Sequence, residues 1–402
     1  ICVSFILEGP LSPIYADQMD PSGVFVSEPV ESLESNPVSD LPEVSPYEAP
    51  IVTTVPEGEP LPVEPPPQRQ PIVDPAIQLE ESGLPHGANE YEVYELITNP
   101  DENFPGITAF ANPPDTVMDV GPNHIVQMVN ATQFRVWDKN GNPLTGVINF
   151  GGLWSFGNPC RSNAGDPIVV YDHLADRWLL SQFSPAGDEC IAISQTPDPT
   201  ANYFTYRFPM SAFPDYPKFG VWPDGYYMST FEGSVLGIFV FDRANMLLGN
   251  PATYIKTSIP AFGAPGVRAT RILPSDLDGQ PPPAGTPNFF VRTVDNQQNP
   301  GTSDRIEVYE ATVNWSSQRL FFSRVNTLLP NPFQIMLCNR NGGGTRDCIP
   351  QPDTSSTVDA LSNRPMMQLK YRNFGSFAAM VFNQTIDVSA SVSAFFEVTG
   401  IR

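Results

Sequence analysis

The chain has 402 residues and a formal net charge of −23, from 44 acidic and 21 basic side chains. This charge argues against nucleic acid and anionic membrane surfaces as partners, because a basic stripe is needed to displace counterions from phosphates. The 46 prolines exclude a mostly helical fold, while the 41% of apolar residues suffices for a sizeable core.

The first residues read as the remnant of a secretory signal. Residues 1–7 are almost wholly apolar, and the small Ala16 stands before Asp17 at a plausible cleavage point. No other stretch approaches the roughly 20 apolar residues that a membrane-spanning helix needs. We therefore expect residues 1–16 to be this remnant, and the protein to be extracellular, secreted or at the cell surface, with no transmembrane segment in the chain as given.

The next stretch is acidic and rich in proline. Residues 1–100 hold 18 acids, 18 prolines and a single base, Arg69. Such a composition favours an extended chain that repels itself and buries little apolar surface. We interpret residues 17–104 as a disordered acidic spacer; a tail that binds calcium or a protein partner is the alternative.

From residue 105 onward the sequence becomes a series of short strands separated by Asn-Gly, Asp-Gly and Asn-Pro turns. Three units align on Asp115, Asp166 and Asp215, which are 51 and 49 residues apart. Each unit offers four short strands in meander order, which is the pattern of a β-propeller. A β-sandwich is the competing fold, but it does not explain the equal spacing.

The units can be followed in chain order to the end of the sequence. The predicted strands of the first three are 115–118, 124–128 and 134–138; 167–172, 177–181, 190–194 and 203–206; 219–222, 226–230 and 237–242. A fourth unit runs through 268–325, and a fifth starts near 366 and reaches 398 without a fourth strand. The prediction is an all-β propeller with about five visible blades at 105–402, the last incomplete unless residues 91–97 supply a strand.

The cysteines agree with export. Cys2 lies in the signal remnant, and the even number that remains suggests disulfides in an oxidising compartment. We predict the pairs Cys160–Cys190 and Cys338–Cys348. Zinc is the alternative, but the three histidines lack the spacing of zinc ligands.

The leading aspartates are the candidate site. The first strand of each propeller blade lines the central channel, so Asp115, Asp166 and Asp215 are expected to face one another at one mouth. Glycoside hydrolysis uses a carboxylic acid and a carboxylate on either side of the scissile bond, and Glu232 is a further candidate for the acid. The same aspartates could instead hold Ca²⁺ or cap local turns.

Three aromatic residues and one histidine are candidates for ligand contact. Trp137, Trp222 and Tyr226 have rings that can stack on sugars, although aromatic residues in strands more often belong to the core. His124 is a candidate general base or ligand contact, with a surface or hydrogen-bonding role as the alternative.

Several spaced motifs resemble a family of uncharacterised, secreted bacterial β-propeller proteins. They are residues 112–124, 165–167 with 171–178, 196–200 and 215–218. The resemblance spans about 105–402 and implies fold and compartment, but no activity. Members often carry a further blade with a Trp-Met-Gly-Ser stretch, which this chain lacks. More distantly, an Asp-Pro that enters a strand is similar to five-bladed β-propeller glycosidases.

The sequence thus predicts an exported β-propeller that binds an extracellular glycan or another surface polymer. A glycoside hydrolase that uses the channel aspartates is the alternative, and a structural or adhesive repeat protein is a third. No cofactor is predicted apart from the Ca²⁺ alternative.

Overall fold

A computed structural model describes residues 23–44, 102–108, 111, 113–262, 270–296, 299, 302–330, 332–335, 347–350 and 354–385. Over these residues the chain is all-β, with one short α-helix, α1 (Arg243–Leu248), and a few 3₁₀ turns. The described part contains no helix that is both long and apolar enough to cross a membrane. The predicted signal remnant and the strand at 91–97 lie outside the described residues.

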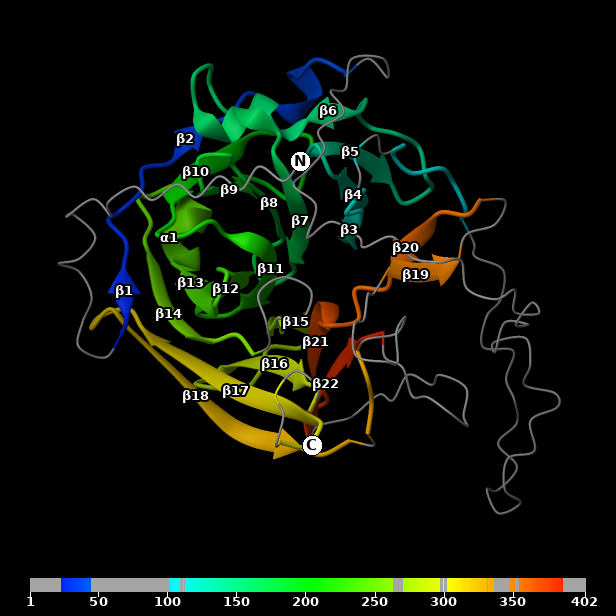
Figure 1. Ribbon diagram of the computed structural model, residues 1–402. Helices are drawn as coiled ribbons and strands as arrows, with labels where there is room; N and C mark the ends of the chain where they lie inside the picture. Colours follow the sequence, from blue (N-terminus) through cyan, green and yellow to red (C-terminus); the bar gives the residue numbers. More distant parts are fainter. Residues whose placement is uncertain are drawn as a thin grey trace.

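Four antiparallel meanders surround one axis and confirm the predicted β-propeller (Figure 1). The inner strands β3, β7, β11 and β15 lie nearest the axis, and the chain then runs outward through each blade. Blade 1 is β3 (Val117–Val120), β4 (His124–Val129), β5 (Gln133–Asp138) and β6 (Ile148–Asn149); blade 2 is β7 (Gly165–Asp172), β8 (Arg177–Phe183), β9 (Asp188–Ser194) and β10 (Tyr203–Pro209); blade 3 is β11 (Asp215–Trp222), β12 (Gly225–Phe231), β13 (Val235–Phe241) and β14 (Tyr254–Pro260); blade 4 is β15 (Leu273–Gly279), β16 (Asn288–Val294), β17 (Arg305–Asn314) and β18 (Arg319–Leu328).

The core consists of apolar layers between successive blades. Alternate residues of a strand point to opposite faces of its sheet, so Val169 of β7 enters the layer shared with blade 1 while Ile168 enters the layer shared with blade 3. A third layer joins blades 3 and 4. Both faces of the central strands are buried, which explains their near-continuous apolar sequence and excludes a β-sandwich.

The fifth unit is present as two strands. β21 (Met366–Asn373) and β22 (Ala378–Asn383) form an antiparallel pair, as predicted. β21 also pairs in parallel with the inner strand β15, so that the pair extends the sheet of blade 4. A separate pair is formed by β19 (Asp347–Pro350) and β20 (Thr357–Asp359). The predicted strand near 394–398 lies outside the described residues.

Residues 23–44, which we call the strap, correct part of the predicted spacer. Its strand β1 (Phe25–Val26) pairs with β14 of blade 3, and its strand β2 (Leu33–Glu34) pairs with β10 of blade 2. A bridge from Glu43 to Ile148 reaches blade 1. Phe25 and Val38 are buried in the blade cores. Because average composition hides these anchors, the sequence predicted a spacer here; residues 45–101 lie outside the described ones.

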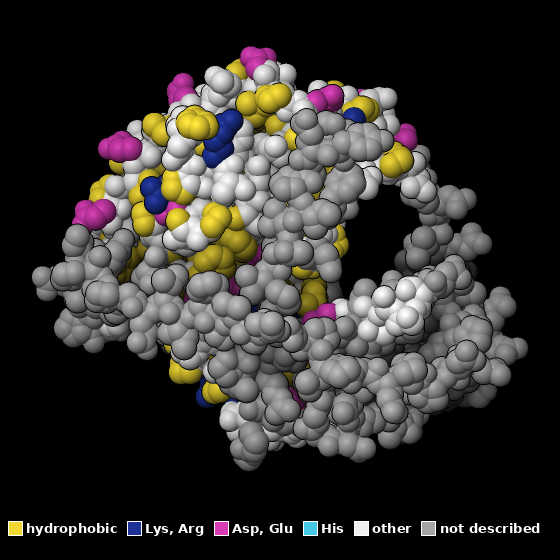
Figure 2. Space-filling view, turned by 45° about the horizontal axis from the view of Figure 1, so that its top comes forward, with side chains coloured by type: hydrophobic (Ala, Val, Ile, Leu, Met, Phe, Trp, Pro, Cys, Tyr) yellow, Lys and Arg dark blue, Asp and Glu magenta, His cyan; other side chains and the backbone are white. Residues whose placement is uncertain are grey.

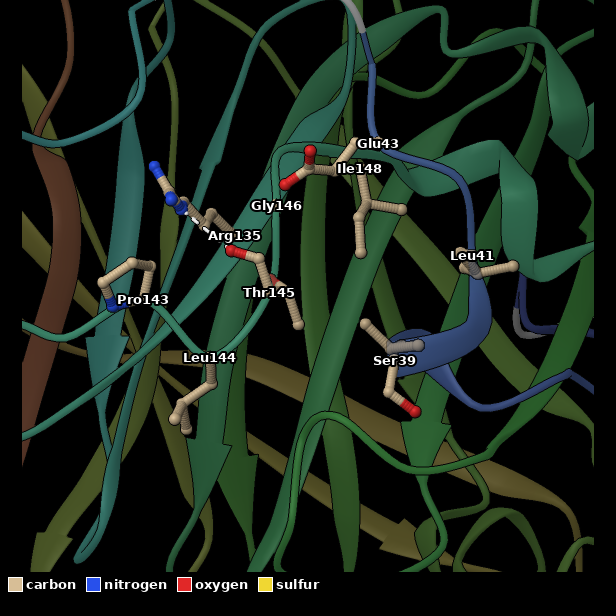
Figure 3. Close-up of a pocket in the computed structure, with 10 residues that line it drawn as sticks. Ser39, Leu41, Glu43, Arg135, Pro143, Leu144, Thr145, Gly146 and Ile148 are labelled. Atoms are coloured by element: carbon tan, nitrogen blue, oxygen red, sulfur yellow. Dashed lines mark hydrogen bonds between the residues drawn. The ribbon is translucent and has the colours of Figure 1, made fainter.

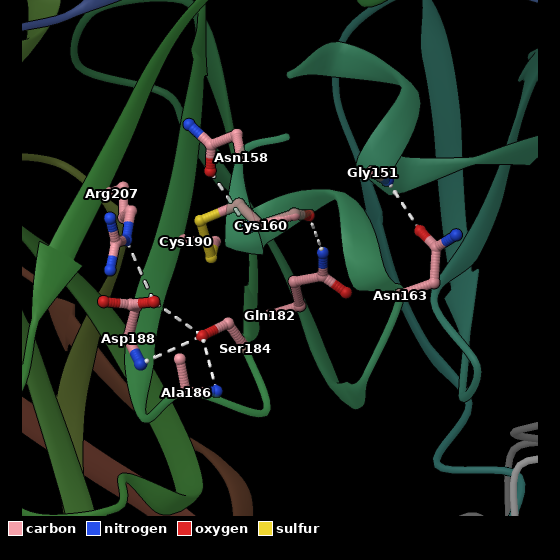
Figure 4. Close-up of a disulfide and its surroundings, with 10 residues drawn as sticks. All are labelled: Gly151, Asn158, Cys160, Asn163, Gln182, Ser184, Ala186, Asp188, Cys190 and Arg207. Atoms are coloured by element: carbon pink, nitrogen blue, oxygen red, sulfur yellow. Dashed lines mark hydrogen bonds and ion pairs between the residues drawn. A yellow bond between two sulfur atoms is a disulfide. The ribbon is translucent and has the colours of Figure 1, made fainter. Parts of the chain in front are cut away.

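The predicted disulfide Cys160–Cys190 is confirmed (Figure 4). Cys160 lies in a 3₁₀ turn before blade 2, and Cys190 lies in β9, with Cα atoms 5.7 Å apart. Gln182 donates a hydrogen bond to the Cys160 carbonyl at 2.6 Å. The disulfide between Cys160 and Cys190 indicates an oxidising compartment. The side chains of the other predicted pair, Cys338–Cys348, lie outside the described residues.

One polar cluster joins blades 2 and 3. Asp172, at the end of β7, is fully buried and accepts hydrogen bonds from the Tyr226 hydroxyl at 2.8 Å and from Arg243 Nε at 2.7 Å and Nη2 at 3.0 Å. Arg243 begins α1, so a bidentate guanidinium ties the helix of blade 3 to the inner strand of blade 2. This cluster lies at the end of the propeller where the inner strands finish.

Candidate functional site

The opposite end, where the inner strands begin, is called the mouth. Hydrogen bonds align the inner strands side by side: Tyr171 N–H donates to Asp119 at 2.8 Å, and Val221 N–H donates to Asp276 at 2.9 Å. Because neighbouring inner strands are aligned in this way, the residues at or just before their starts all lie at the same end of the propeller. The structure therefore places the three predicted aspartates, Asp115, Asp166 and Asp215, at the mouth, each partly exposed.

The backbone at the mouth is irregular, and this sets the direction of the side chains. Asp115 and Asp166 have φ of 37° and 47°, and Tyr216 has φ of 54°. Positive φ is uncommon for a residue other than glycine but is tolerated best by Asp and Asn. β7 and β11 each carry a bulge in their first residues. A bulge re-aims the side chains near it, so the aspartates do not follow the regular alternation of their strands.

Each aspartate has a partner outside its own turn. Asn130 Nδ2, from the end of β4, donates to Asp115 Oδ2 at 2.7 Å. The backbone N–H of Tyr216 in blade 3 donates to Asp166 Oδ2 at 3.2 Å. Arg271 Nη2 lies 3.7 Å from Asp215 Oδ2. Asp115 therefore connects two strands of blade 1, Asp166 connects blades 2 and 3, and Asp215 connects blades 3 and 4. The three side chains neither cap only their own turns nor stand as isolated carboxylates.

Three cations gather around the ring of Tyr216. Lys218 Nζ lies 3.9 Å from the ring centroid, Arg364 Cζ lies 4.5 Å away, and Arg271 Cζ lies 5.8 Å away. Arg271 also stacks on Phe231, with Cζ 3.6 Å from that ring centroid. Cations at these distances are attracted to the face of an aromatic ring. The mouth thus combines acids from blades 1 to 3 with cations from blades 3 and 4 and the segment before β21.

The two arginines were missed by the sequence prediction, although the repeat contains a signal for them. Arg271 precedes β15 and Arg364 precedes β21, as Asp115 precedes β3. Arg364 is also followed by a proline, as Asp166 is. Extending the alignment of leading residues to the fourth and fifth units would have placed both arginines beside the aspartates.

A buried acid, Glu189, is a further missed residue. It lies in β9 and is fully buried, and neither carboxylate oxygen has a hydrogen-bond partner among the described residues. Burial raises the pKa of Glu189 to about 8, and the charge of Asp166 adds to this rise, while the charge of Lys218 opposes it. Glu189 is therefore protonated at pH 7 beneath the charged groups of the mouth.

The remaining predicted site residues lie elsewhere. The side chain of Glu232 is 3% exposed, and its carboxylate binds Lys256 Nζ at 2.7 Å. As whole residues, Trp137, Trp222 and Tyr226 are 3%, 1% and 0% exposed. The prediction of sugar-stacking aromatics is therefore wrong for these three, and the core interpretation is correct, because strands between two blades bury both faces.

His124 also lies away from the mouth. It begins β4, which runs antiparallel to β3, so it is at the end of blade 1 opposite Asp115. His124 is therefore not part of a common site with the aspartates. Over the described ranges, no group of three or more His, Cys, Asp or Glu side chains is arranged to hold a metal ion.

The surface and one groove complete the description. Figure 2 shows single acidic and basic side chains among hydrophobic and polar ones, without a continuous basic stripe among the described residues of that face. A groove of about 400 Å³ lies between the strap and blade 1 (Figure 3). Leu41 and Ile148 line it, together with Arg135, whose Nε donates to the Thr145 carbonyl at 3.0 Å. None of the predicted site residues lines this groove.

No protein-family model matches the chain, and no curated protein matches it. Its fold is similar to that of an exo-β-1,3-galactanase from Phanerochaete chrysosporium, at 12% identity and a TM-score of 0.29, over 55% of this chain and 50% of that one. It is also similar to a GH43 β-1,3-galactosidase, at 11% identity and a TM-score of 0.29, over 59% of this chain and 50% of that one. A third similar structure is the catalytic domain of a GH62 α-L-arabinofuranosidase from Coprinopsis cinerea, at 8% identity and a TM-score of 0.32, over 69% of this chain and 86% of that one. The chain spans half the length of the first two. This distant similarity identifies no family and assigns no activity.

Proposed function

We propose that the protein is an exported β-propeller that binds an extracellular glycan or another surface polymer at its mouth. One observation carries this proposal: partly exposed carboxylates from three blades meet cations and the ring of Tyr216 at one end of the axis. Arg271 and Arg364 are buried, so the donor, acceptors and ring that can orient a polar ligand here are Lys218, the carboxylates and Tyr216. The disulfide and the predicted signal remnant support an extracellular location.

Binding is favoured over catalysis by the state of the acids. A general acid must come within hydrogen-bond reach of the oxygen that it protonates. Glu232 is buried against Lys256, and Glu189 is fully buried. Neither presents a carboxyl group at the surface, and Asp115 and Asp166 already accept hydrogen bonds from the fold.

Glycoside hydrolysis is the second candidate, and one observation favours it. Glu189 has a raised pKa while Asp166 is close enough to contribute to that rise. A carboxyl group with a raised pKa beside a second carboxyl group is a usual basis of acid and base roles in one site. This reading requires Glu189 to become accessible when a ligand is bound.

The experiment is a glycan screen on the purified protein, read both for retention and for released reducing ends. The variants are Asp115→Asn, Asp166→Asn and Asp215→Asn. Asp278→Asn is the matched control, because Asp278 lies near the end of β15 away from the mouth and pairs with the exposed Arg372. Losing a hydrogen bond with a charged group costs about 1.5–3 kcal/mol, so retention should weaken roughly tenfold or more in a mouth variant.

The outcomes separate the candidates. Retention that weakens in the mouth variants but not in Asp278→Asn, without release, supports the binding proposal. Release that disappears in a mouth variant would make the protein a hydrolase. Retention that is the same in all four variants would remove the mouth as the binding site.

A further inference from the structure

Blade 4 holds a cluster of three arginines around one carboxylate, separate from the mouth residues. Glu307 is fully buried, and Arg292 Nε lies 2.6 Å from its Oε2. Arg305 Nε and Arg324 Nη1 each lie 2.7 Å from Oε1. The Tyr309 hydroxyl donates to Oε2 at 2.6 Å. Arg292, Arg305, Glu307 and Arg324 are called the arginine cluster below.

Strand register explains why these side chains meet. Glu307 of β17 stands directly opposite Arg292 of β16. Arg305 is two residues earlier on β17, so it shares the face of Glu307. Arg324 of β18 stands opposite Tyr309, next to a shift in register between Val308 and Tyr309. The cluster is therefore fixed by three paired strands of blade 4.

The cluster carries more positive than negative charge. Three guanidinium groups surround one carboxylate, which leaves a net charge of +2. Burial would raise the pKa of Glu307, but the Tyr309 hydrogen bond and the Arg292 charge outweigh it and lower this pKa to about 2. Glu307 is therefore charged at neutral pH, and both of its oxygens already accept hydrogen bonds.

Nearby acids are engaged with the backbone. Asp304 accepts hydrogen bonds from the N–H groups of Asn296 at 2.7 Å and Phe333 at 2.8 Å. Asp295 accepts one from Ile335 at 2.9 Å. Among the described residues the three arginines form ion pairs with Glu307, and Arg292 and Arg305 also donate to the carbonyls of Pro260 at 2.8 Å and Ser303 at 3.3 Å. Hydrogen bonds from the backbone do not cancel the charge of a carboxylate, so a further anion is best placed at the exposed side of Arg324.

The cluster is open to solvent on one side. The side chains of Arg292 and Arg305 are 4% and 11% exposed, whereas that of Arg324 is 50% exposed. Phe262 covers Arg292 and Arg305, with its ring centroid 4.2 and 5.5 Å from their Cζ atoms. An approaching anion therefore meets Arg324 first. Arginine is well suited to this role, because its planar fork matches a carboxylate or sulfate.

The position of the cluster points to a polymer as the ligand. β16 runs antiparallel to β15, so its last residues, including Arg292, lie towards the end where β15 begins, which is the mouth. A polymer bound at the mouth can therefore extend over blade 4. The net charge of −23 repels every polyanion, acidic polysaccharides as well as nucleic acid, so recognition here has to come from the local contact with the arginines.

We propose that the arginine cluster binds a carboxylate or sulfate group of an acidic extracellular polysaccharide. This site uses none of the mouth residues, so it goes beyond the proposed function. Arg324 makes the first contact from solvent, and Glu307 with Phe262 holds the other two guanidinium groups in place. The protein should therefore prefer acidic over neutral polysaccharides.

The test compares wild type with Arg324→Gln, a substitution at a half-exposed side chain. Polygalacturonate supplies carboxylates, a sulfated galactan supplies sulfates, and an unsulfated galactan is the neutral reference; dissociation constants are measured for each. Arg372→Gln is the matched control, because Arg372 is also about half exposed, pairs with an acid, and lies at the opposite end of blade 4. Urea unfolding of each variant checks that the fold is retained.

We expect Arg324→Gln to weaken binding of an acidic polymer about tenfold or more, as the loss of a charge-assisted hydrogen bond predicts. Arg372→Gln should leave binding unchanged, and the polymer that responds identifies the group. Equal binding of the neutral galactan, no response to Arg324→Gln, or an equal response to Arg372→Gln would overturn the proposal. Duplex DNA that competes as strongly as the acidic polymer would overturn the assignment to polysaccharide.

The result can be read independently of the mouth. Acidic binding that depends on Arg324 but not on the three aspartates supports the arginine cluster and rejects the mouth proposal. Binding that depends on the aspartates but not on Arg324 does the reverse.

Discussion

Glu189→Gln should stabilise the protein at neutral and alkaline pH. Glu189 is fully buried in β9, and its carboxyl oxygens have no hydrogen-bond partner among the described residues. Its pKa rises from 4.5 to about 8, chiefly through burial. Glutamine resembles the protonated acid in shape and carries no charge, so it removes the cost of ionising this position.

The sign and size follow from the pKa shift. Between pH 4.5 and 8 the folded state keeps a proton that the unfolded state has released, so the free energy of unfolding falls as pH rises. Each pKa unit corresponds to about 1.4 kcal/mol, so the full shift amounts to at most about 5 kcal/mol. The loss is absent below pH 4.5 and complete above pH 8.

Urea unfolding at several pH values between 4 and 9 measures this effect. The quantity of interest is the difference between Glu189→Gln and wild type, which cancels the contributions of other titrating groups. Glu232→Gln is the matched control. It removes a buried acid that pairs with Lys256, so it should lower the free energy of unfolding by about 3 kcal/mol at pH 7.

One result would refute the reasoning about Glu189. If the stability difference between Glu189→Gln and wild type does not grow between pH 5 and 8, Glu189 does not keep its proton in the folded state. A loss of stability in Glu189→Gln equal to that in Glu232→Gln would show that Glu189 is ionised and paired.

Two further predictions concern the parts that hold the propeller together. Replacing Cys160 and Cys190 by alanine removes a cross-link between residues 30 apart, so the free energy of unfolding should fall by about 3–4 kcal/mol in urea; an unchanged urea midpoint would contradict a stabilising role. Phe25→Ala removes a buried anchor of the strap, which should cost about 3 kcal/mol locally and speed protease cleavage within residues 23–44. Cleavage at the wild-type rate would mean that the strap is held mainly by its backbone pairing.

Much of the propeller could be predicted because its signals are local. The strands alternate with Asn-Gly and Asp-Gly turns, and Asp115, Asp166 and Asp215 recur at nearly equal spacing. The predicted strands of blades 1 to 3 match observed strands to within a few residues, whereas the outer strands β6 and β14 were not among them. Cys160 and Cys190 could be paired because they are 30 residues apart, whereas the other two cysteines, Cys338 and Cys348, lie far along the chain.

The strap could not be predicted, because its partners are distant in sequence. Phe25 pairs with Lys256 and Leu33 pairs with Thr205 across most of the domain. Proline and acids dominate the surrounding composition, so a few buried apolar residues are not visible in an average.

The sequence by itself determined the fold class, one disulfide and the acids that begin the inner strands, because turn chemistry and strand spacing are written locally. It predicted about five blades, of which the structure describes four and a further pair of strands. Only the tertiary structure decided which side chains are exposed and can contact a ligand. Trp137, Trp222 and Tyr226 became core because strands between two blades bury both faces. Arg271 met Asp215, and three arginines met Glu307, because pairing between strands places side chains that no local pattern connects.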